Sequence, residues 1–570
     1  MVPQLPGAAL TGVKSRAAAP GDKGQVVVRW PRFASGCLVA LLLGSDGLAG
    51  ATPLYQRLCL PCHGAAGDGR GPAAALLPVA PRDFVRAEYK WRSTATGQLP
   101  LASDLERIIT RGVPGAMPAF ALTPAQLAAL VREVQAFSPR FLRPTPAPVP
   151  LPAGRPDAVR GRGLFRRLGC VACHRASDLA PVLGSVEEVA RTLRTGLNGT
   201  AMPAYTTLSG DELWALAAYA SSARVGRPVG PASPVPPTSP APSTSPAPSA
   251  SPAPAPPPAV ADPLFPGTVL AMGPAPAGLA PAERTLSALQ CARCHAAEYR
   301  AWSGSRHALA LGPGPQALIE ASTRASGAAC RGCHTPTAEQ PAEGVTCASC
   351  HLRGWRKLGP RTRPAALPDP VLDVVTEPRF ERADFCLPCH QAPPFLDTYR
   401  EWLLGPYMPR GFVCQHCHMP AGDHGFRGAH DPDAVRQGIA LEARALAGTL
   451  LVTLANVGCG HHFPTTGTPV ARLEVSFDGA PALTERIGKG PPDTRIPSGA
   501  SRQLRFAVPA GARSARVALQ FLPDAFYVDV YRRDLATRKL LPEARARLEE
   551  ALRRAETSGF LVHQREVALP

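Results

Sequence analysis

Apolar and polar positions follow different periods along the 570-residue chain, and these periods divide it into segments. Helical periodicity, with apolar residues every three or four positions, covers 127–137, 211–223 and 542–557. Strand-like alternation between Gly, Pro and Asp turns instead marks four runs, at 449–455, 471–477, 501–508 and 514–521. The pattern predicts a multidomain chain with helical N-terminal regions, and an antiparallel β-sandwich near the C-terminus that is followed by a helix.

The first 51 residues have the pattern of an export signal. Arg29 and Arg32 precede an apolar stretch from Phe33 to Leu43, and Ala49-Gly50-Ala51 has the small residues of a cleavage site. The stretch is short for a transmembrane helix, although an uncleaved anchor is the alternative. A start just upstream of Arg29 is also open. We therefore expect residues 1–51 to be a signal peptide that directs the protein to the periplasm or cell envelope.

Residues 225–262 are rich in Pro, Ala and Ser. Such a segment has too few apolar side chains to form a core, and its prolines favour extended polyproline II structure. We expect a semi-rigid linker that separates two halves of the protein.

Seven copies of Cys-x-x-Cys-His run through the chain, and they dominate its chemistry. In this motif two thiols form thioether bonds to haem c, and the following imidazole ligates the iron. A zinc half-site or a redox disulfide would explain a Cys-x-x-Cys pair, but neither requires a His directly afterwards in all seven copies. The thioether cysteines are expected to be Cys59, Cys62, Cys170, Cys173, Cys291, Cys294, Cys330, Cys333, Cys347, Cys350, Cys386, Cys389, Cys414 and Cys417. The proximal iron ligands are expected to be His63, His174, His295, His334, His351, His390 and His418.

The cysteine count and the charge agree with seven covalently bound haem c groups. The motifs use 14 of the 16 cysteines and leave Cys37, in the leader, and Cys459, which we expect to be a small buried residue rather than a soft ligand. The formal charge of +18 would suggest a nucleic acid or a membrane surface as partner. Fourteen haem propionates would lower it to +4 with ferrous iron, or +11 with ferric iron. We therefore expect no nucleic-acid partner, and peripheral membrane association stays open.

Two segments repeat one arrangement of motif, Met-Pro loop and closing helix. In residues 52–143 the loop is Gly112–Pro118, and in residues 155–224 it is Ala201–Pro203. An internal repeat of this kind indicates two tandem domains of one fold.

Both repeats resemble class I cytochrome c, which implies small all-α domains. The resemblance also implies that Met117 and Met202 are axial iron ligands, although a Met more often simply fills a core. His63 and Met117 are 54 residues apart, but His174 and Met202 only 28. The second module must therefore lack much of the intervening segment.

Residues 263–434 carry five motifs in about 170 residues, too few for five separate cytochrome folds. The haems must lie close to one another and take the place of an apolar core, with short helices and loops around them. The flanking sequence resembles the multihaem cytochrome family that includes the tetrahaem nitrification cytochromes. The resemblance is carried by residues 298–308, 344–346, 398–402, 418–420, 424–431 and 456–465.

This resemblance implies that histidines outside the motifs supply the second axial ligands. They would be His307, His424, His430 and His461, with His462 as the register alternative to His461. A lone His is otherwise a surface or satisfied core residue, as we expect for His563. Thirteen of the fourteen histidines nevertheless lie in or near haem segments.

Five proximal histidines and four distal candidates leave one iron five-coordinate unless His416, His462 or Met419 ligates it. An open iron would allow reduction or oxidation of a small nitrogen or sulfur compound. Against an enzyme, the chain has no Cys-x-x-Cys-Lys motif and no recognisable catalytic constellation, and we assign no catalytic residue. Arg495 and Tyr527 are expected to be solvated. Electron transfer is therefore favoured, with the question of enzyme activity open.

Ligand identity predicts the direction of electron flow. His/Met ligation raises the reduction potential of a haem, and His/His ligation lowers it. Electrons should pass from the pentahaem half to the dihaem half, which must dock across the linker, and then to a redox partner. That partner would be another cytochrome, a quinol-oxidising complex or a terminal oxidase or reductase. Residues 435–533 would cap the haem domain through the His461 loop, and 534–570 would be a helix and tail.

Overall fold

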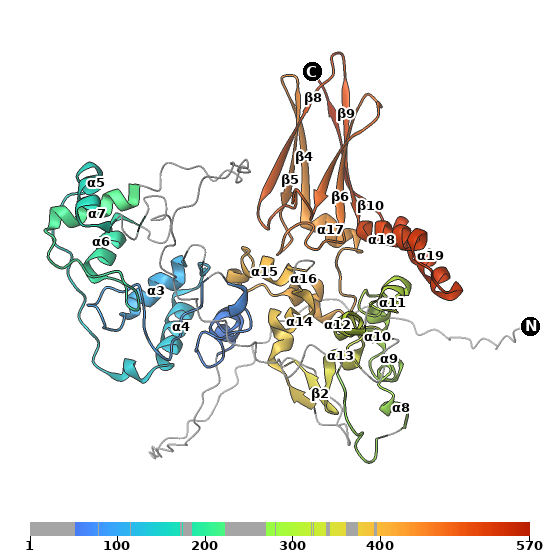
Figure 1. The fold of residues 1–570 in the computed structure, drawn as a ribbon, viewed down its shortest axis with the longest axis horizontal. Helices are drawn as coiled ribbons and strands as arrows, with labels where there is room; N and C mark the ends of the chain where they lie inside the picture. The colour runs from blue at the N-terminus through green and yellow to red at the C-terminus, as the bar shows by residue number, and fades with distance from the viewer. Residues whose placement is uncertain are drawn as a thin grey trace, which may run out of the picture. The chain divides into compact units, whose positions relative to one another are not determined.

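The computed structural model describes residues 52–77, 79–113, 116–170, 174, 185–222, 270–279, 281–320, 322, 324–337, 343–360, 374–392 and 396–570. The expected signal segment with Cys37, the Pro-rich linker and Cys173 lie outside the described residues. Figure 1 shows helices through most of this chain and an antiparallel sheet region near the C-terminus, so the predicted multidomain character is confirmed at that level. Within the described residues, no helix is both long and apolar enough to span a membrane.

The first module consists of short helices that begin at well-defined caps. They are α1 (Pro53–Leu58), α2 (Leu60–His63), α3 (Ala102–Arg111) and α4 (Pro124–Ala136), with 3₁₀ turns η1 (Ala74–Leu76) and η2 (Pro139–Leu142). Thr52 and Thr123 cap α1 and α4, and each is followed by a Pro whose missing N–H costs nothing in the first turn. The α4 helix packs on α1 and α3 around Tyr55 and Leu130. The motif at Cys59–His63 therefore lies against the module's core.

The second module repeats this plan with α5 (Ala158–Arg167), α6 (Val186–Thr195) and α7 (Gly210–Ser222). Helices α5 and α7 cross closely because residue 161 is Gly, where an added Cβ would lie 2.0 Å from the Ala215 carbonyl oxygen. The buried Arg92 of the first module donates to the carbonyl oxygens of Thr195 (2.8 Å) and Gly196 (3.2 Å) at the end of α6. These bonds satisfy carbonyls that a helix end leaves unpaired.

Residues 270–438 form short helices and turns around the motifs. The helices are α8 (Pro281–Arg284), α9 (Ala288–Cys291), α10 (Ala296–Ser303), α11 (Pro313–Glu320), α12 (Arg324–His334), α13 (Cys347–His351), α14 (Leu387–His390), α15 (Thr398–Leu403), α16 (Cys414–His418) and α17 (Pro432–Gly438). A small sheet joins β1 (Leu352–Arg353), β2 (Arg356–Gly359) and β3 (Val374–Thr376). Short helices packed around cofactor positions are what the dense spacing of the motifs predicts.

The C-terminal sheet region is a sandwich of two antiparallel sheets. One sheet has the order β10-β9-β6-β7 and the other β4-β5-β8. The strands are β4 (Ile439–Leu446), β5 (Thr449–Asn456), β6 (Val470–Phe477), β7 (Leu483–Gly488), β8 (Ser501–Ala507), β9 (Ser514–Leu522) and β10 (Phe560–Ala568). One buried cluster contains Leu450 and Val452 from one sheet with Leu473 and Leu519 from the other, so the sheets pack face to face.

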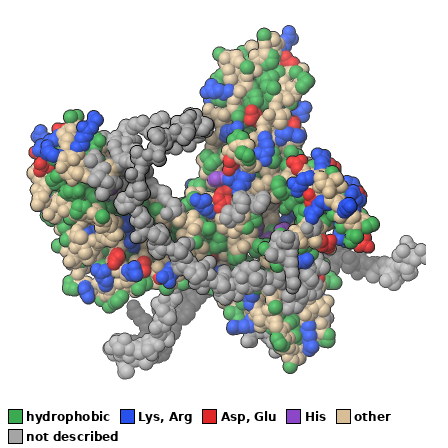
Figure 2. Space-filling view, in the orientation of Figure 1, with side chains coloured by type: hydrophobic (Ala, Val, Ile, Leu, Met, Phe, Trp, Pro, Cys, Tyr) green, Lys and Arg blue, Asp and Glu red, His purple; other side chains and the backbone are tan. Residues whose placement is uncertain are grey.

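Two helices and the last strand complete this region. Helices α18 (Ala525–Thr537) and α19 (Pro542–Glu556) pack on each other and on α11, and the predicted terminal helix is present. Figure 2 shows basic and acidic side chains intermixed over α18 and α19. After α19 the chain does not end in a simple tail, because 560–568 pair with β9 from Phe560 opposite Phe521 onward.

Candidate haem-binding sites

Where the structure describes both cysteines, the motifs fold as helical turns, which place their two thiols on one side. The backbone N–H of the motif His donates to the carbonyl of the first Cys in the motifs that end at His63 (2.8 Å), His174 (2.9 Å), His295 (2.9 Å) and His390 (3.0 Å). Because residues three apart on a helix share a face, both thiols are presented together. This geometry suits attachment of one planar group by two bonds.

The motif histidines are oriented by backbone carbonyls. The Nδ1–H of His63 donates to Arg82 O (2.9 Å), that of His334 to Ala310 O (2.7 Å), and that of His351 to Leu358 O (2.9 Å). His418 bonds Arg427 O in the same way. Such a bond fixes the tautomer and leaves Nε2 free to ligate a metal. Desolvation lowers the pKa of His63 to about 4, so this imidazole is neutral, as a ligand must be.

Three motif histidines face a histidine from outside the motifs. His390 and His307 have ring centres 6.3 Å apart, while the pairs His351–His424 and His418–His461 are each at 6.1 Å. A metal–imidazole bond is about 2 Å long, so two imidazoles on opposite sides of one metal hold their ring centres roughly 6 Å apart. The pairs therefore fit an iron between them. Desolvation lowers the pKa of His307 and of His461 to about 4, which keeps both neutral.

Each N-terminal module holds its Met in the same way. Helix α3 ends at Gly112 (φ 67°), after which Val113 N donates to Met117 O (2.7 Å) and Phe120 N to Ile109 O (3.1 Å). Helix α6 ends at Gly196 (φ 65°), and Tyr205 N donates to Leu193 O (2.8 Å). An added Cβ at Gly112 would lie 2.6 Å from Met117 O. The Met-Pro loop therefore requires Gly where the helix ends.

Other candidate residues are placed differently. His430 Nε2 lies 3.0 Å from Asp524 Oδ2, so the nitrogen that a distal ligand would use is already bonded. Within the described part of the chain, neither His295 nor His334 has a facing imidazole at the spacing of the three pairs. His563 lies in β10 and bonds Ile439 O (2.7 Å).

Three further residues considered as ligands have local roles. The Nδ1 of His416 accepts from Val413 N (3.0 Å) within its own motif turn. His462 lies beside Glu401, with Nδ1 3.7 Å from its carboxylate. Cys459 packs against the sandwich core, and desolvation raises its pKa to about 12, so it is a thiol and a poor metal ligand.

The structure also orders the five motifs in space, which the sequence did not reveal. Cysteines of different motifs lie next to each other in three pairs, namely Cys291–Cys347, Cys333–Cys389 and Cys386–Cys414. Phe426 adds a further link, because its ring packs 4.1 Å from His307 and 6.0 Å from His424, the partners of two different motif histidines. The motif at Cys386–His390 therefore adjoins two others through its thiols and a third through Phe426.

The first module adjoins this region as well. Its buried cluster, which includes Tyr55 and Leu58, continues into Tyr399, Trp402 and Val413, with Cys62 and Cys414 packed against it. The Tyr399 hydroxyl is buried and lacks a hydrogen-bond partner among the described residues.

The family described as cytochrome c oxidase, cbb3-type, subunit III matches residues 48–132 and 156–219, which are the two Met-containing modules. The chain is a multihaem c-type cytochrome. Comparison with curated proteins found no match to this cytochrome.

Two solved structures are similar to parts of the cytochrome. A chain of the reducing HAO-like protein complex of Kuenenia stuttgartiensis is 30% identical over 30% of the cytochrome and 94% of that chain, with a TM-score of 0.29. The penta-haem cytochrome c552 of Thermochromatium tepidum is 21% identical over 50% of the cytochrome and 98% of that chain, with a TM-score of 0.38.

Proposed function

We propose that the cytochrome binds seven haem c groups and carries electrons from its pentahaem domain to its two N-terminal modules. The observation that carries the proposal is the spacing of the three imidazole pairs, 6.1–6.3 Å, which leaves room for iron but for no substrate. When bound, haem c supplies reversible one-electron chemistry at iron. The chain's own residues attach the groups, fill their axial positions and keep water from them.

The axial ligands set the direction of flow. In the pentahaem domain His307, His424 and His461 would be distal ligands, and in the modules Met117 and Met202. A thioether sulfur favours ferrous iron more than an imidazole does, so the modules would have the higher potentials. Electrons would then move downhill into the modules.

The thiol contacts give the path within the pentahaem domain. Groups attached through Cys291 and Cys347 would be neighbours, and so would those attached through Cys386 and Cys414. The Cys62 and Cys414 sites flank one apolar cluster, which would carry electrons into the first module. We further propose export to the periplasm or cell envelope and exchange with another redox protein, such as a cytochrome, a quinol-oxidising complex or a terminal oxidase or reductase.

The test is a spectroelectrochemical titration of the purified cytochrome, with haem content measured by iron and pyridine haemochrome assays. We expect seven haems, two of higher potential with Met ligation and at least three of lower potential with bis-His ligation. Equal potentials in the two sets, or fewer than three low-spin bis-His signals by electron paramagnetic resonance, would contradict the proposal.

A second function, reduction or oxidation of a small nitrogen or sulfur compound, is favoured by one group of side chains. His334 lacks a facing imidazole among the described residues. Tyr527 interacts with Cys330 of the same motif and with Asp524, which contacts His430 (Oδ2 to Nε2, 3.0 Å) and Arg306 (Oδ1 to Nη2, 3.7 Å). The pKa of Tyr527 is raised, mainly by desolvation and further by the charges of Asp524 and Cys330. The side chains of His430, Arg306 and Tyr527 would donate hydrogen bonds to an anionic ligand on an open iron, and Asp524 would orient His430 and Arg306.

This second function has its own test. Nitrite and hydroxylamine are added to the oxidised cytochrome and the paramagnetic resonance spectrum is recorded. A high-spin signal that shifts on addition would support the enzyme, whereas a wholly low-spin, unchanged spectrum would exclude it and leave electron transfer.

A further inference from the structure

The loop that carries His461 belongs to the sandwich, not to the haem domain. It connects β5 to β6, and the buried Asn456 at the end of β5 fixes its course. The Asn456 side chain donates to His461 O (2.9 Å) and Ile496 O (3.0 Å) and accepts from Cys459 N (3.1 Å). The sandwich therefore fixes the loop backbone at His461 from one side.

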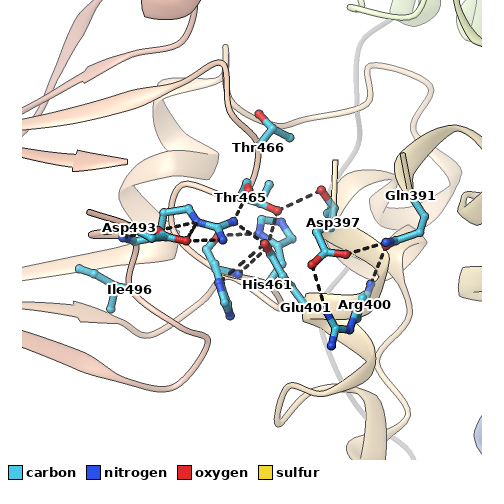
Figure 3. A network of polar contacts seen from close by, with 12 residues as sticks. Gln391, Asp397, Arg400, Glu401, His461, Thr465, Thr466, Asp493 and Ile496 are labelled. Carbon is cyan, nitrogen blue, oxygen red and sulfur yellow. Dashed lines mark hydrogen bonds and ion pairs between the residues drawn. The ribbon is translucent and has the colours of Figure 1, made fainter. Parts of the chain in front are cut away.

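A carboxylate from the haem domain binds the other side of this loop. Glu401 lies on α15, and its side chain is only 4% exposed. Its Oε2 accepts from His462 N (3.2 Å) and from the hydroxyl of Thr465 (2.5 Å), so it binds the loop on both sides of residues 463–464. Figure 3 shows Glu401 and Thr465 in one polar network with Asp493.

Arg495 completes this contact from the sandwich. Its Nη1 pairs with Glu401 Oε1 and donates to Thr465 O (2.6 Å), and its side chain is 8% exposed. Asp493 holds the guanidinium from behind, through Nε (2.9 Å) and Nη2 (2.7 Å). The sequence led us to expect a solvated Arg495. In the structure its side chain is instead enclosed between two carboxylates.

Two buried opposite charges depend on each other. Each has left water. Removal of Arg495 leaves the buried Glu401 without its guanidinium partner, and removal of Glu401 leaves Arg495 with Asp493 as its remaining carboxylate partner. The loop between them bonds both partners, so loss of either charge removes contacts that position His461, while the Asn456 bond to its backbone remains. His307 and His424 differ from His461, because they lie within the haem domain itself.

We propose that Glu401 and Arg495 are positioning residues that hold His461 on the haem of Cys414–His418. This inference rests on the proposed ligation of that haem by His461. Its consequence is that the sixth ligand of one haem comes from the sandwich and is held toward the haem domain by the Glu401–Arg495 pair and by the loop bonds to Glu401. The haem of Cys414–His418 is then the bis-His site that opens most readily.

The test uses paramagnetic resonance and imidazole binding on the full-length cytochrome with four substitutions. Arg495→Gln and Glu401→Gln remove one charge each, with little change in shape. Arg516→Gln is the matched control, because Arg516 lies on the same sandwich but is 58% exposed and 3.9 Å from its partner Glu566. His461→Ala removes the proposed ligand itself.

We expect one haem to change from low spin to high spin in His461→Ala. The same signal should change at least in part in Arg495→Gln and Glu401→Gln, and added imidazole should restore low spin in all three. Imidazole should bind Arg495→Gln about tenfold more tightly than the native cytochrome, because His461 no longer competes fully for the iron. Arg516→Gln should match the native cytochrome.

The outcomes distinguish the proposed ligation by His461 from the proposed positioning role of Glu401 and Arg495. If His461→Ala leaves every haem low-spin, the proposed ligation itself is wrong. If His461→Ala opens one haem while both charge variants keep native spectra and native imidazole affinity, ligation stands and the positioning role is overturned. Should Arg495→Gln fail to fold, the milder Thr465→Val substitution removes one bond of the network, and native imidazole affinity in that variant would also overturn the positioning role.

Discussion

The two N-terminal modules and the pentahaem domain bind the same kind of group by opposite designs. In each module the motif His and the Met come from one continuous segment, and a Gly at the end of a helix turns the Met loop. In the pentahaem domain the facing imidazoles come from distant segments, as with His390 and His307 or His418 and His461. Each module therefore supplies both proposed ligands from its own segment, whereas the proposed pentahaem sites combine residues from distant parts of the chain.

This difference affects robustness as well as potential. A module keeps its own apolar core, for example around Leu213 and Leu216, so its fold does not rest on the haem alone. Around the motif of Cys347 the described buried cluster is small and includes Leu352 and Trp355. Bound haem groups would supply the remaining contacts around this motif, so loss of one axial ligand should disturb several haem sites together.

The largest expected effect tests which histidines outside the motifs are iron ligands. His424→Ala should convert one haem to high spin, because the iron held by His351 then has a protein ligand on one side only. His430→Ala should leave the number of low-spin haems unchanged, because His430 bonds Asp524 instead. Paramagnetic resonance of the two oxidised variants tests this. A high-spin signal in His430→Ala but not in His424→Ala would reverse the assignment.

The second expectation concerns the Met ligands. Met117→His should make the first module resemble the pentahaem sites and lower its potential by on the order of 0.1–0.3 V, within the roughly 0.8 V range that haem ligation spans. Met408, which is also followed by Pro but is buried in the core, provides the control. Met408→Leu should leave all potentials unchanged, at a stability cost of less than about 1.5 kcal/mol. Spectroelectrochemical titration measures both.

A smaller effect tests the Gly that closes the Met loop. Gly112→Ala places a Cβ 2.6 Å from Met117 O at a positive φ, and should cost roughly 1–3 kcal/mol and loosen Met ligation. Gly97 also has a positive φ, but an added Cβ meets nothing within 4 Å. Gly97→Ala should therefore lower the melting temperature less and leave the haem absorption spectrum native. Equal destabilisation with native spectra in both would refute the steric argument.

The sequence predicted the features that depend on local pattern. The motif turns, the Met-Pro loops, the terminal helix and the strands of the sandwich all follow from residues close together in the chain. The alternation of residues 449–455, for instance, recurs in β5 as buried residues that face the other sheet.

Features that depend on long-range contact were harder to predict. Three of the four proposed distal histidines face a motif His, but only the folded chain shows which pairs form and that His430 has another partner. The burial of Arg495 was missed, because a guanidinium is normally solvated and its partner Glu401 lies 94 residues away. Strand β10 was missed because it pairs with β9 across two intervening helices.

The smallest expected effect concerns the pH dependence of stability at the pair of Asp524 and His430, which lies outside the N-terminal modules. Burial alone would raise the pKa of Asp524, but the hydrogen bond from His430 and the charges of His430 and Arg306 outweigh it, and the pKa is lowered overall. A lowered pKa contributes stability above the unfolded value of about 3.9, and that contribution is lost as the pH falls through the folded value.

Asp524→Asn should thus reduce stability by about 1 kcal/mol at pH 7, and this difference should shrink below about pH 4. Asp433→Asn, at an exposed pair with Arg436, should change stability by less than about 0.5 kcal/mol. Denaturant melts of both variants at pH 7 and pH 3 measure these differences. A loss of stability in Asp524→Asn that does not change with pH would show that the Asp524 charge does not contribute to stability.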